Sequence, residues 1–285
     1  MKKNYKKIYL AIAVICLLIA VAAGAYLVKY FLDLQKGERE NEALREQIEI
    51  AEESSEEVQP TETSAASEET VNTSEETASS AEGETEEALL RKIDFADMQA
   101  NTNEDIYSWI YIPDTNIDYP VLQHPTDDTY YLNYNMDGTK GYPGCIYTEK
   151  ANAKDYTDFN TVLYGHNMKN GSMFHDLHKY ADASFMEEHP CVYVYLPDQT
   201  LKYQIFAAYR YDDRHLLYSF DYNSEKVREG YLQDIFNLRD LSAVLDDAVE
   251  VTAEDTIITL STCIGGQDNR RFLVQAVLLE EGINE

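Results

Sequence analysis

The stretch TLSTCIGGQDNRRFLVQA, residues 259–276, contains two apolar runs separated by a polar segment with two glycines. With their flanking residues these runs predict β-strands over 255–263 and 271–280, because both are rich in β-branched and other apolar side chains. Cys263 ends the first strand, and two arginines, Arg270 and Arg271, lie at the start of the second. A cysteine at the end of a strand is either a buried small hydrophobic residue or a nucleophile. The cellular location of the chain and the histidines that can reach Cys263 bear on that choice.

The rest of the C-terminal part repeats the pattern of short apolar runs bounded by Pro, Gly, Asn and Asp. These runs predict six further strands, over residues 108–113, 118–123, 144–149, 160–165, 191–197 and 201–212. Helical spacing of apolar residues predicts helices over 89–99, 171–180 and 224–241. Eight strands with few helices predict a mainly β domain, an eight-stranded closed or nearly closed β-barrel with peripheral helices.

The N-terminus has the features of a membrane anchor. Four lysines within residues 1–7 precede an uncharged stretch of 21 residues, 8–28. About 20 helical residues cross the hydrocarbon core of a bilayer, so 8–28 predicts a transmembrane signal-anchor. Lysines ahead of a span favour a cytoplasmic N-terminus and an extracellular remainder, which places the chain in the cell membrane. Residues 23–25 also resemble a signal-peptidase site, but the length of the apolar run and Lys29 directly after it favour a retained anchor.

An acidic segment separates this anchor from the β-rich part. Residues 38–88 contain 18 acidic residues, two arginines and no aromatic residue. Such a composition buries too little apolar surface to fold and repels itself, so 29–88 predicts a disordered stalk, although its first part is also compatible with a longer membrane helix. Residues 89–285 are long enough for one domain with a sizeable core. Their 33 acidic and 15 basic residues argue against a nucleic-acid partner.

Three of the four cysteines, Cys145, Cys191 and Cys263, lie outside the predicted membrane span. An odd number leaves at least one thiol free even if the other two pair. Cys145 and Cys191 adjoin apolar or aromatic runs, which is typical of buried small hydrophobic residues. Cys263 is therefore the candidate for a reactive thiol.

His166 is the candidate base for that thiol. It follows the predicted strand over 160–165, and Gly165 allows the backbone to turn directly before it. An imidazole at the carboxyl end of a strand, before a loop, is well placed to face a groove. Adjacent parallel strands ending together would bring His166 and Cys263 within reach. The other histidines have structural interpretations; His175 and His178 form H-x-x-H without an evident third ligand, so no metal site is predicted.

The motifs around the cysteine, the histidine and the arginine resemble those of a known family. TLSTC followed by an arginine that opens a strand resembles the active-site signature of sortases. The segments 164–180 (YGHNMKNGSMFHDLHKY), 108–123 and 127–149 resemble class B sortases, and the resemblance extends over about residues 89–280. It implies a sortase-type β-barrel on the outer face of a Gram-positive membrane. It also implies that Cys263 is the nucleophile, His166 the acid/base and Arg271 the oxyanion or substrate-positioning group. Arg270 is the neighbour that could be confused with Arg271, and strand alternation points the two in opposite directions, so only one of them faces the site.

The same resemblance suggests the substrates. Leu132, Tyr164, Ser261 and Thr262 match positions that line the peptide groove of the family, although they also fit ordinary barrel positions. The implied donor is a surface protein with a C-terminal sorting motif, and the implied acceptor is an amine of a peptidoglycan precursor or of a pilin lysine. A thioester on the cysteine would link the two half-reactions, and no cofactor is required.

One position departs from the family pattern. Some class B sortases have an aspartate two residues after the cysteine, and Gly265 occupies that position here; Asp268 replaces it only if the loop folds back. Two other classes of function remain open at this point. They are an extracellular cysteine protease that hydrolyses the acyl-enzyme and a non-catalytic β-barrel adhesin on a stalk, and the Cys, His and Arg in matching motifs argue against the adhesin.

Overall fold

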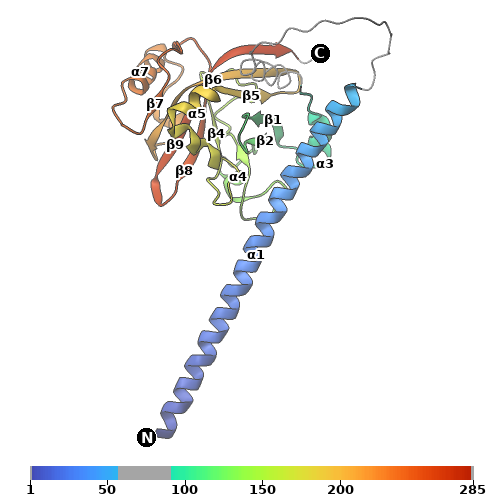
Figure 1. The fold of residues 1–285 in the computed structure, drawn as a ribbon, viewed down its shortest axis with the longest axis vertical. Helices are drawn as coiled ribbons and strands as arrows, with labels where there is room; N and C mark the ends of the chain where they lie inside the picture. Colours follow the sequence, from blue (N-terminus) through green and yellow to red (C-terminus); the bar gives the residue numbers. More distant parts are fainter. Residues whose placement is uncertain (1, 57–90, 284–285) are drawn as a thin grey trace, which may run out of the picture.

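The computed structural model of the chain describes residues 2–56 and 91–283. Its helices are α1 Lys2–Glu56, α3 Phe95–Asn101, α4 Tyr130–Asn133, the 3-10 helix η1 His175–Ala181, α5 Ala183–Glu188, α6 Leu216–Ser219 and α7 Glu225–Phe236. Its strands are β1 Ile106–Tyr111, β2 Asp118–Leu122, β3 Ile146–Tyr147, β4 Asn160–Tyr164, β5 Cys191–Tyr195, β6 Gln199–Asp212, β7 Val244–Leu245, β8 Ile257–Ile264 and β9 Gln267–Ile283. Figure 1 shows a β-rich domain beside one long helix.

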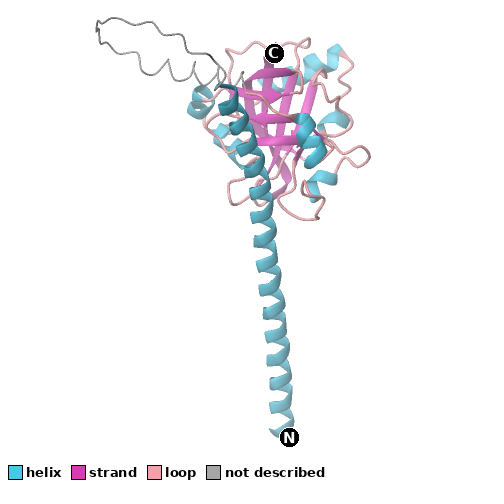
Figure 2. Ribbon diagram, turned by 90° about the vertical axis from the view of Figure 1, so that its right-hand side faces the viewer, coloured by secondary structure: helices cyan, strands magenta, loops and turns pink. Residues whose placement is uncertain are grey.

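Eight of these strands close into a barrel. Neighbouring strands follow the order β5-β1-β2-β3-β4-β8-β9-β6, and β6 pairs again with β5, which completes the ring (Figure 2). The short strand β7 is an addition on the outer side of β6. Two pairings, β2 with β3 and β4 with β8, are parallel, and the others are antiparallel. The predicted eight-stranded β-barrel is therefore confirmed, and each of the eight predicted strands overlaps one of the strands in the ring.

Alternation along the strands distributes the apolar side chains between the inside of the barrel and its outer wall. Inside, all eight strands contribute to one buried cluster, with Ile110 on β1, Leu163 on β4 and Val274 on β9 as examples. Their chain neighbours point outward into two further clusters. Trp109 packs beneath α1 and α3, and Leu273 packs beneath α7. The helices therefore cover the apolar side chains that point outward from the barrel strands.

Over residues 29–56, helix α1 corrects the prediction of a disordered stalk and confirms the alternative that the first part of the acidic segment prolongs the membrane helix. The helix runs without interruption from the predicted span to Glu56, and its second half lies along the barrel (Figures 1 and 2). Positions 34, 37, 41, 44 and 48 are buried, which is a spacing of three and four residues on one helix face. Glutamate, leucine, alanine and glutamine are also strong helix formers. Net charge therefore does not prevent this part from folding; residues 57–88 lie outside the described residues.

Specific contacts fix α1 against the barrel. Leu44 and Ile48 join the cluster that contains Trp109. The Arg45 Nε atom donates to the carbonyl of Asp118 at 2.8 Å, and its guanidinium lies 4.8 Å from the centre of the Tyr119 ring. Gly37 approaches Pro143 so closely that a Cβ atom there would be 2.6 Å from the proline ring. The docked part of α1 thus begins where the membrane-like part ends.

The predicted helices are only partly confirmed. The 89–99 prediction corresponds to α3, which begins at Phe95 because the Asp94 side chain caps it by accepting from the amide of Asp97 at 2.9 Å. The 224–241 prediction corresponds to α7, which ends at Phe236. The 171–180 prediction corresponds to the 3-10 helix η1 and not to an α-helix. Helices α4 and α6 are single turns, too short for a periodic signal.

Candidate active site

His166 and Cys263 lie at the ends of neighbouring parallel strands. Strand β4 pairs in parallel with β8, and the last pair in the register is Tyr164 with Ser261. His166 follows two residues after Tyr164, and Cys263 follows two residues after Ser261. The sequence prediction that adjacent strands bring these two side chains to the same end of the barrel is therefore confirmed.

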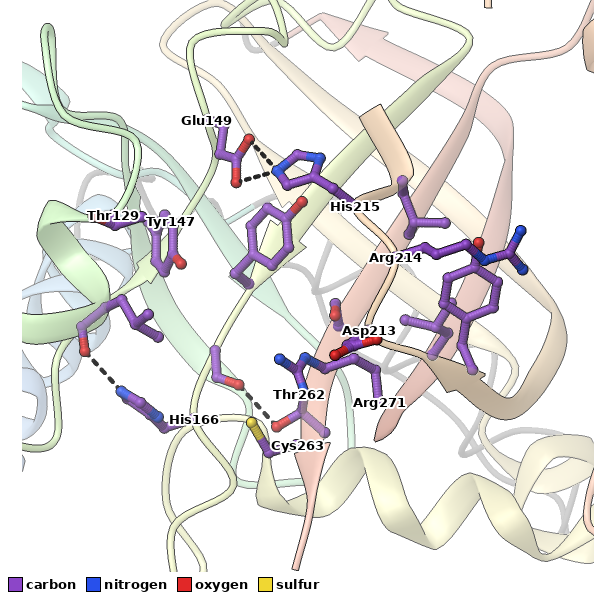
Figure 3. Close-up of a pocket in the computed structure, with 17 residues that line it drawn as sticks. Thr129, Tyr147, Glu149, His166, Asp213, Arg214, His215, Thr262, Cys263 and Arg271 are labelled. Atoms are coloured by element: carbon purple, nitrogen blue, oxygen red, sulfur yellow. Dashed lines mark hydrogen bonds and ion pairs between the residues drawn. The ribbon is translucent and has the colours of Figure 1, made fainter. Parts of the chain in front are cut away.

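Arg271 enters the same region from the next strand. Strands β8 and β9 are antiparallel, and Cys263 is directly paired with Arg271. Residues paired in this way project to the same face of the sheet. Arg270, one position earlier, is exposed and is paired with Asp212 on β6. In Figure 3, Cys263 lies between His166 and Arg271.

The ring of His166 is held by the chain segment around Leu132. Its Nε2 atom lies 2.8 Å from the Leu132 carbonyl oxygen, to which it donates a hydrogen bond, so the lone pair of the neutral ring is on Nδ1. The Tyr142 ring contacts the imidazole edge-on, with 5.1 Å between the ring centres. Burial lowers the pKa of His166 below its ordinary 6.5, and the hydrogen bond to Leu132 opposes that shift in part. The neutral ring is thus favoured when no substrate is bound.

Close packing explains the residues that flank His166. A Cβ atom on Gly165 would be 2.5 Å from Ile146 and 2.7 Å from Phe174, so only glycine fits there. The Gly165 amide donates to the Ser261 carbonyl at 3.1 Å, and the Thr262 hydroxyl donates to the Gly165 carbonyl at 2.8 Å. The backbone turn before His166 is therefore attached to the strand that carries Cys263.

All seven residues predicted from the sequence line one groove. Its volume is about 390 Å³, and Cys263, His166 and Arg271 share its wall with Leu132, Tyr164, Ser261 and Thr262 (Figure 3). Of the four residues predicted to contact substrate, Ser261 and Thr262 are buried, whereas Leu132 is 36% exposed. Leu132 and Tyr164 therefore present more of their side chains to an occupant of the groove.

The structure adds a hydrogen-bonded pair that the sequence analysis missed, between a buried carboxylate, Glu149, and a partly exposed histidine, His215. His215 donates from Nε2 to the Glu149 carboxylate at 2.9 Å, and both residues line the groove (Figure 3). Burial raises the pKa of Glu149, and the hydrogen bond from His215 opposes that shift. The two residues are 66 positions apart in the sequence, and His215 lies in a polar loop, so no local pattern indicated the pair.

The predicted H-x-x-H histidines also lie close to the site. His178 contacts the carbonyl oxygen of Cys263 at 3.1 Å, and His175 contacts the side chain of Asn167 at 2.8 Å. Sequence reasoning considered these histidines only as metal ligands or as structural residues.

The other cysteines differ from Cys263 in exposure. Cys145 is buried, as predicted, and burial raises its thiol pKa strongly. Cys191 is partly buried, and Cys263 is exposed in the groove. None of the four cysteines, all of which lie among the described residues, forms a disulfide. The thiolate is the nucleophilic form of cysteine, so exposure favours Cys263 over Cys145 as the reactive thiol.

Comparisons with known proteins agree with this geometry. Residues 110–279 match the model of the sortase domain. Sortase B of Listeria monocytogenes is 36% identical over 179 residues, which cover 62% of this chain and 71% of that protein. Sortase B of Staphylococcus aureus is 29% identical over 180 residues, which cover 62% and 72%. The chain therefore belongs to the sortase family of cysteine transpeptidases.

Solved structures narrow the relationship to class B. A Staphylococcus aureus sortase B-substrate complex matches with a TM-score of 0.58 and 29% identity, covering 65% of this chain and 84% of that one. Clostridium perfringens sortase B matches with a TM-score of 0.59 and 28% identity, covering 66% and 100%. The barrel of this chain thus matches the barrel of sortase B structures.

A stretch of α1 within Tyr9–Ile48 is long and apolar enough to cross a membrane, with a mean hydropathy of 2.7 over its most apolar window. Leu17, Leu18 and Ile19 are each more than 60% exposed, so this part of the helix presents an apolar surface that the protein does not cover. The position near the N-terminus fits a cell-surface enzyme of this family.

Proposed function

We propose that Cys263, His166 and Arg271 transfer the acyl group of a C-terminal sorting motif to an amine acceptor. One observation carries this proposal: a thiol, an imidazole and a guanidinium open into one groove, and Arg271 is paired across the sheet with Cys263. These three groups supply the nucleophile, the proton carrier and the positive charge that acyl transfer through a thioester needs.

The first half-reaction forms the thioester. With substrate bound, the Cys263 thiol gives its proton to neutral His166, and the resulting thiolate attacks the amide carbonyl carbon of the sorting motif, so that a tetrahedral oxyanion forms. Arg271 stabilises that oxyanion with its positive charge. Protonated His166 gives its proton to the leaving nitrogen as the C–N bond breaks, so the C-terminal fragment leaves as an amine.

The second half-reaction releases the product. An acceptor amine attacks the thioester carbonyl, and neutral His166 takes the proton that the amine loses. The C–S bond then breaks, which restores the Cys263 thiolate and leaves a new amide bond. The lone pair on Nδ1 of His166 is suited to this step, because Nε2 is already occupied by the Leu132 carbonyl.

The groove accounts for binding of an extended peptide. Leu132 and Tyr164 supply apolar contacts close to His166, and the Glu149–His215 pair supplies a polar region of the wall. A peptide in this groove thus meets an apolar region and a polar region, which suits a motif with both kinds of side chain. Ser261 and Thr262 contribute mainly through the strand that carries the nucleophile.

The membrane-like part of α1 supports a proposal for the physiological partners. The lysines before it favour a cytoplasmic N-terminus, which places the barrel outside the cell. A surface protein with a transmembrane tail is then a suitable acyl donor, and an amine of a peptidoglycan precursor or of a pilin lysine is a suitable acceptor. Both substrates would be held at the same surface as the enzyme.

The test compares transfer with hydrolysis. The full chain in detergent micelles is incubated with a sorting-motif peptide, with and without a short amine-bearing peptide. We expect a ligated product that requires the amine, no reaction with Cys263→Ala, and near-normal reaction with Cys191→Ala. Hydrolysis alone in the presence of saturating amine would contradict the proposed transfer, and turnover by Cys263→Ala would contradict the proposed nucleophile.

A further inference from the structure

The carbonyl oxygen of Cys263 lies where a ladder bond is missing. In the parallel pairing of β4 with β8, the Gly165 amide donates to the Ser261 carbonyl at 3.1 Å. If β4 continued, the next donor along the ladder would be the backbone amide of residue 167, facing the Cys263 carbonyl. The chain instead turns away at Gly165 so that His166 can enter the groove.

A side chain replaces that missing donor. The Nδ2 atom of Asn167 donates to the Cys263 carbonyl oxygen at 3.0 Å. Asn167 directly follows His166, so one short segment carries both the proposed acid/base and a bond to the backbone of the proposed nucleophile. A contact of this kind restricts how the end of β8 can move relative to His166.

Two histidines hold the Asn167 amide in the required orientation. His175 donates from Nδ1 to Asn167 Oδ1 at 2.8 Å, which turns Nδ2 toward Cys263. His178 Nε2 lies 2.9 Å from Asn167 Nδ2 and 3.1 Å from the Cys263 oxygen. When each amide hydrogen has its own acceptor, His178 is neutral and its Nε2 accepts from Asn167, so the approach of Nε2 to the Cys263 oxygen is then a contact between two acceptors and not a hydrogen bond.

The surroundings of His178 favour that neutral state. Burial lowers the pKa of His178, the nearby His175 and Arg210 lower it further, and only the contact with the Cys263 carbonyl opposes the shift. The ring also packs against Phe272, with 4.8 Å between the ring centres, so its position does not depend on the hydrogen bonds alone. Phe272 follows Arg271 on β9, which connects the cluster to all three proposed catalytic residues.

We propose that Asn167, oriented by His175 and His178, is a positioning residue that fixes the backbone of Cys263 relative to His166. This inference rests on the proposed function and adds to it three residues that do not line the groove. Displacement of reacting groups by about 1 Å can cost roughly 10²-fold in rate. Loss of the Asn167 contact should therefore reduce kcat by roughly 10- to 100-fold and change KM little.

The test uses three variants of the full chain in detergent micelles. Asn167→Ala removes the donor, and Asn167→Asp keeps the shape but places an acceptor against the carbonyl oxygen. His178→Phe keeps the packing on Phe272 without the ring nitrogen. Asn170→Ala is the matched control, because Asn170 lies in the same loop and accepts hydrogen bonds from Ser172.

Three measurements separate positioning from a general structural role. They are kcat and KM for peptide transfer, the midpoint of thermal unfolding, and the rate at which iodoacetamide alkylates Cys263, followed by peptide mass spectrometry. We expect both Asn167 variants to lower kcat and alter the alkylation rate below the unfolding temperature, with Asn167→Asp at least as impaired as Asn167→Ala. His178→Phe should have a smaller effect of the same kind, and the control should match the unmodified chain.

Two outcomes would overturn the inference. One is unchanged kcat in both Asn167 variants while Cys263→Ala is inactive, which leaves the proposed function standing without this positioning role. The other is an effect on KM alone, which would make Asn167 a binding residue. Turnover by Cys263→Ala would instead refute the proposed function itself.

Discussion

Replacing Arg271 by alanine tests how the guanidinium acts on the reaction. Arg271 and Cys263 are directly paired across β8 and β9, and Cβ atoms in such pairs are about 4.5–5.5 Å apart. An oxyanion formed on a carbonyl bonded to the Cys263 sulfur is then within reach of the long arginine side chain. Removing one such donor costs about 10²- to 10³-fold in kcat, or about 2.7–4 kcal/mol. Arg271 is only partly buried, so the lower end of this range is expected.

The neighbouring arginine gives an internal control. Arg270 is exposed and faces away from the groove, so Arg270→Ala should remain within about a few-fold of the unmodified chain. Arg271→Lys should recover only part of the activity, because lysine offers a compact charge in place of several fixed donors. Steady-state kinetics of peptide transfer measures all three. A larger loss with Arg270→Ala than with Arg271→Ala would refute the assignment of the guanidinium to the site.

Three further predictions concern the pKa of His166, a buried thiol and the docked helix. Tyr142→Ala should admit water to His166 and raise the pKa of His166 toward 6.5, whereas Tyr142→Phe should leave that pKa nearly unchanged. NMR titration measures both variants. An unchanged or lower pKa in the alanine variant would contradict the burial argument. Cys145→Ala should lower the free energy of unfolding by about 0.5–3 kcal/mol and keep most activity, so loss of activity without loss of stability would argue against a purely structural thiol. Leu44→Asp should release the second half of α1 from the barrel, so that trypsin cleaves this part of the helix faster. Glu42→Gln, on the exposed face, should not change the cleavage rate. Equal cleavage rates for Leu44→Asp and the unmodified chain would mean that α1 does not dock in solution.

The barrel and the central residues of the site could be predicted because their signals are local. Each strand has its own short apolar run between turn residues, so the number and position of the strands can be predicted locally. The order of the strands around the ring is the part that the local pattern does not give. Cys263 and His166 each follow such a run directly, so parallel pairing of two strands brings them together. Alternation along β9 allowed only one of the two arginines to face the site, the resemblance to sortases selected Arg271, and the structure pairs Arg271 with Cys263.

Other features depend on contacts between distant residues. Glu149 and His215 pair across the groove although each looks ordinary in its own segment. Asn167 acquires a role only because β4 ends before it and leaves the Cys263 carbonyl without a backbone donor.

The sequence of the docked half of α1 contains the pattern of an amphipathic helix, but its acidic composition favoured the prediction of disorder. Leu34, Gly37, Leu44 and Ile48 are apolar or small residues at helical spacing, and the buried Asn41 lies on the same face, which is the pattern of a helix with one buried face. The acidic composition of 38–88 as a whole favoured disorder instead. Helix propensity and one-sided burial outweigh charge over this part, in which Glu42 and Glu46 are exposed while Glu38 and Glu40 are partly buried.

The most direct test of the account is to locate the acyl group on the enzyme. The full chain is incubated with a sorting-motif peptide in the absence of an amine acceptor, quenched in acid, and analysed by intact-mass and peptide mass spectrometry. We predict an added mass equal to the acyl group of the N-terminal fragment (the free fragment minus one water), attached to Cys263, absent from Cys263→Ala and removed when an amine is added before the acid quench. Peptide cleavage by Cys263→Ala, or an adduct on Cys191 in place of Cys263, would contradict the assignment of Cys263 as the nucleophile.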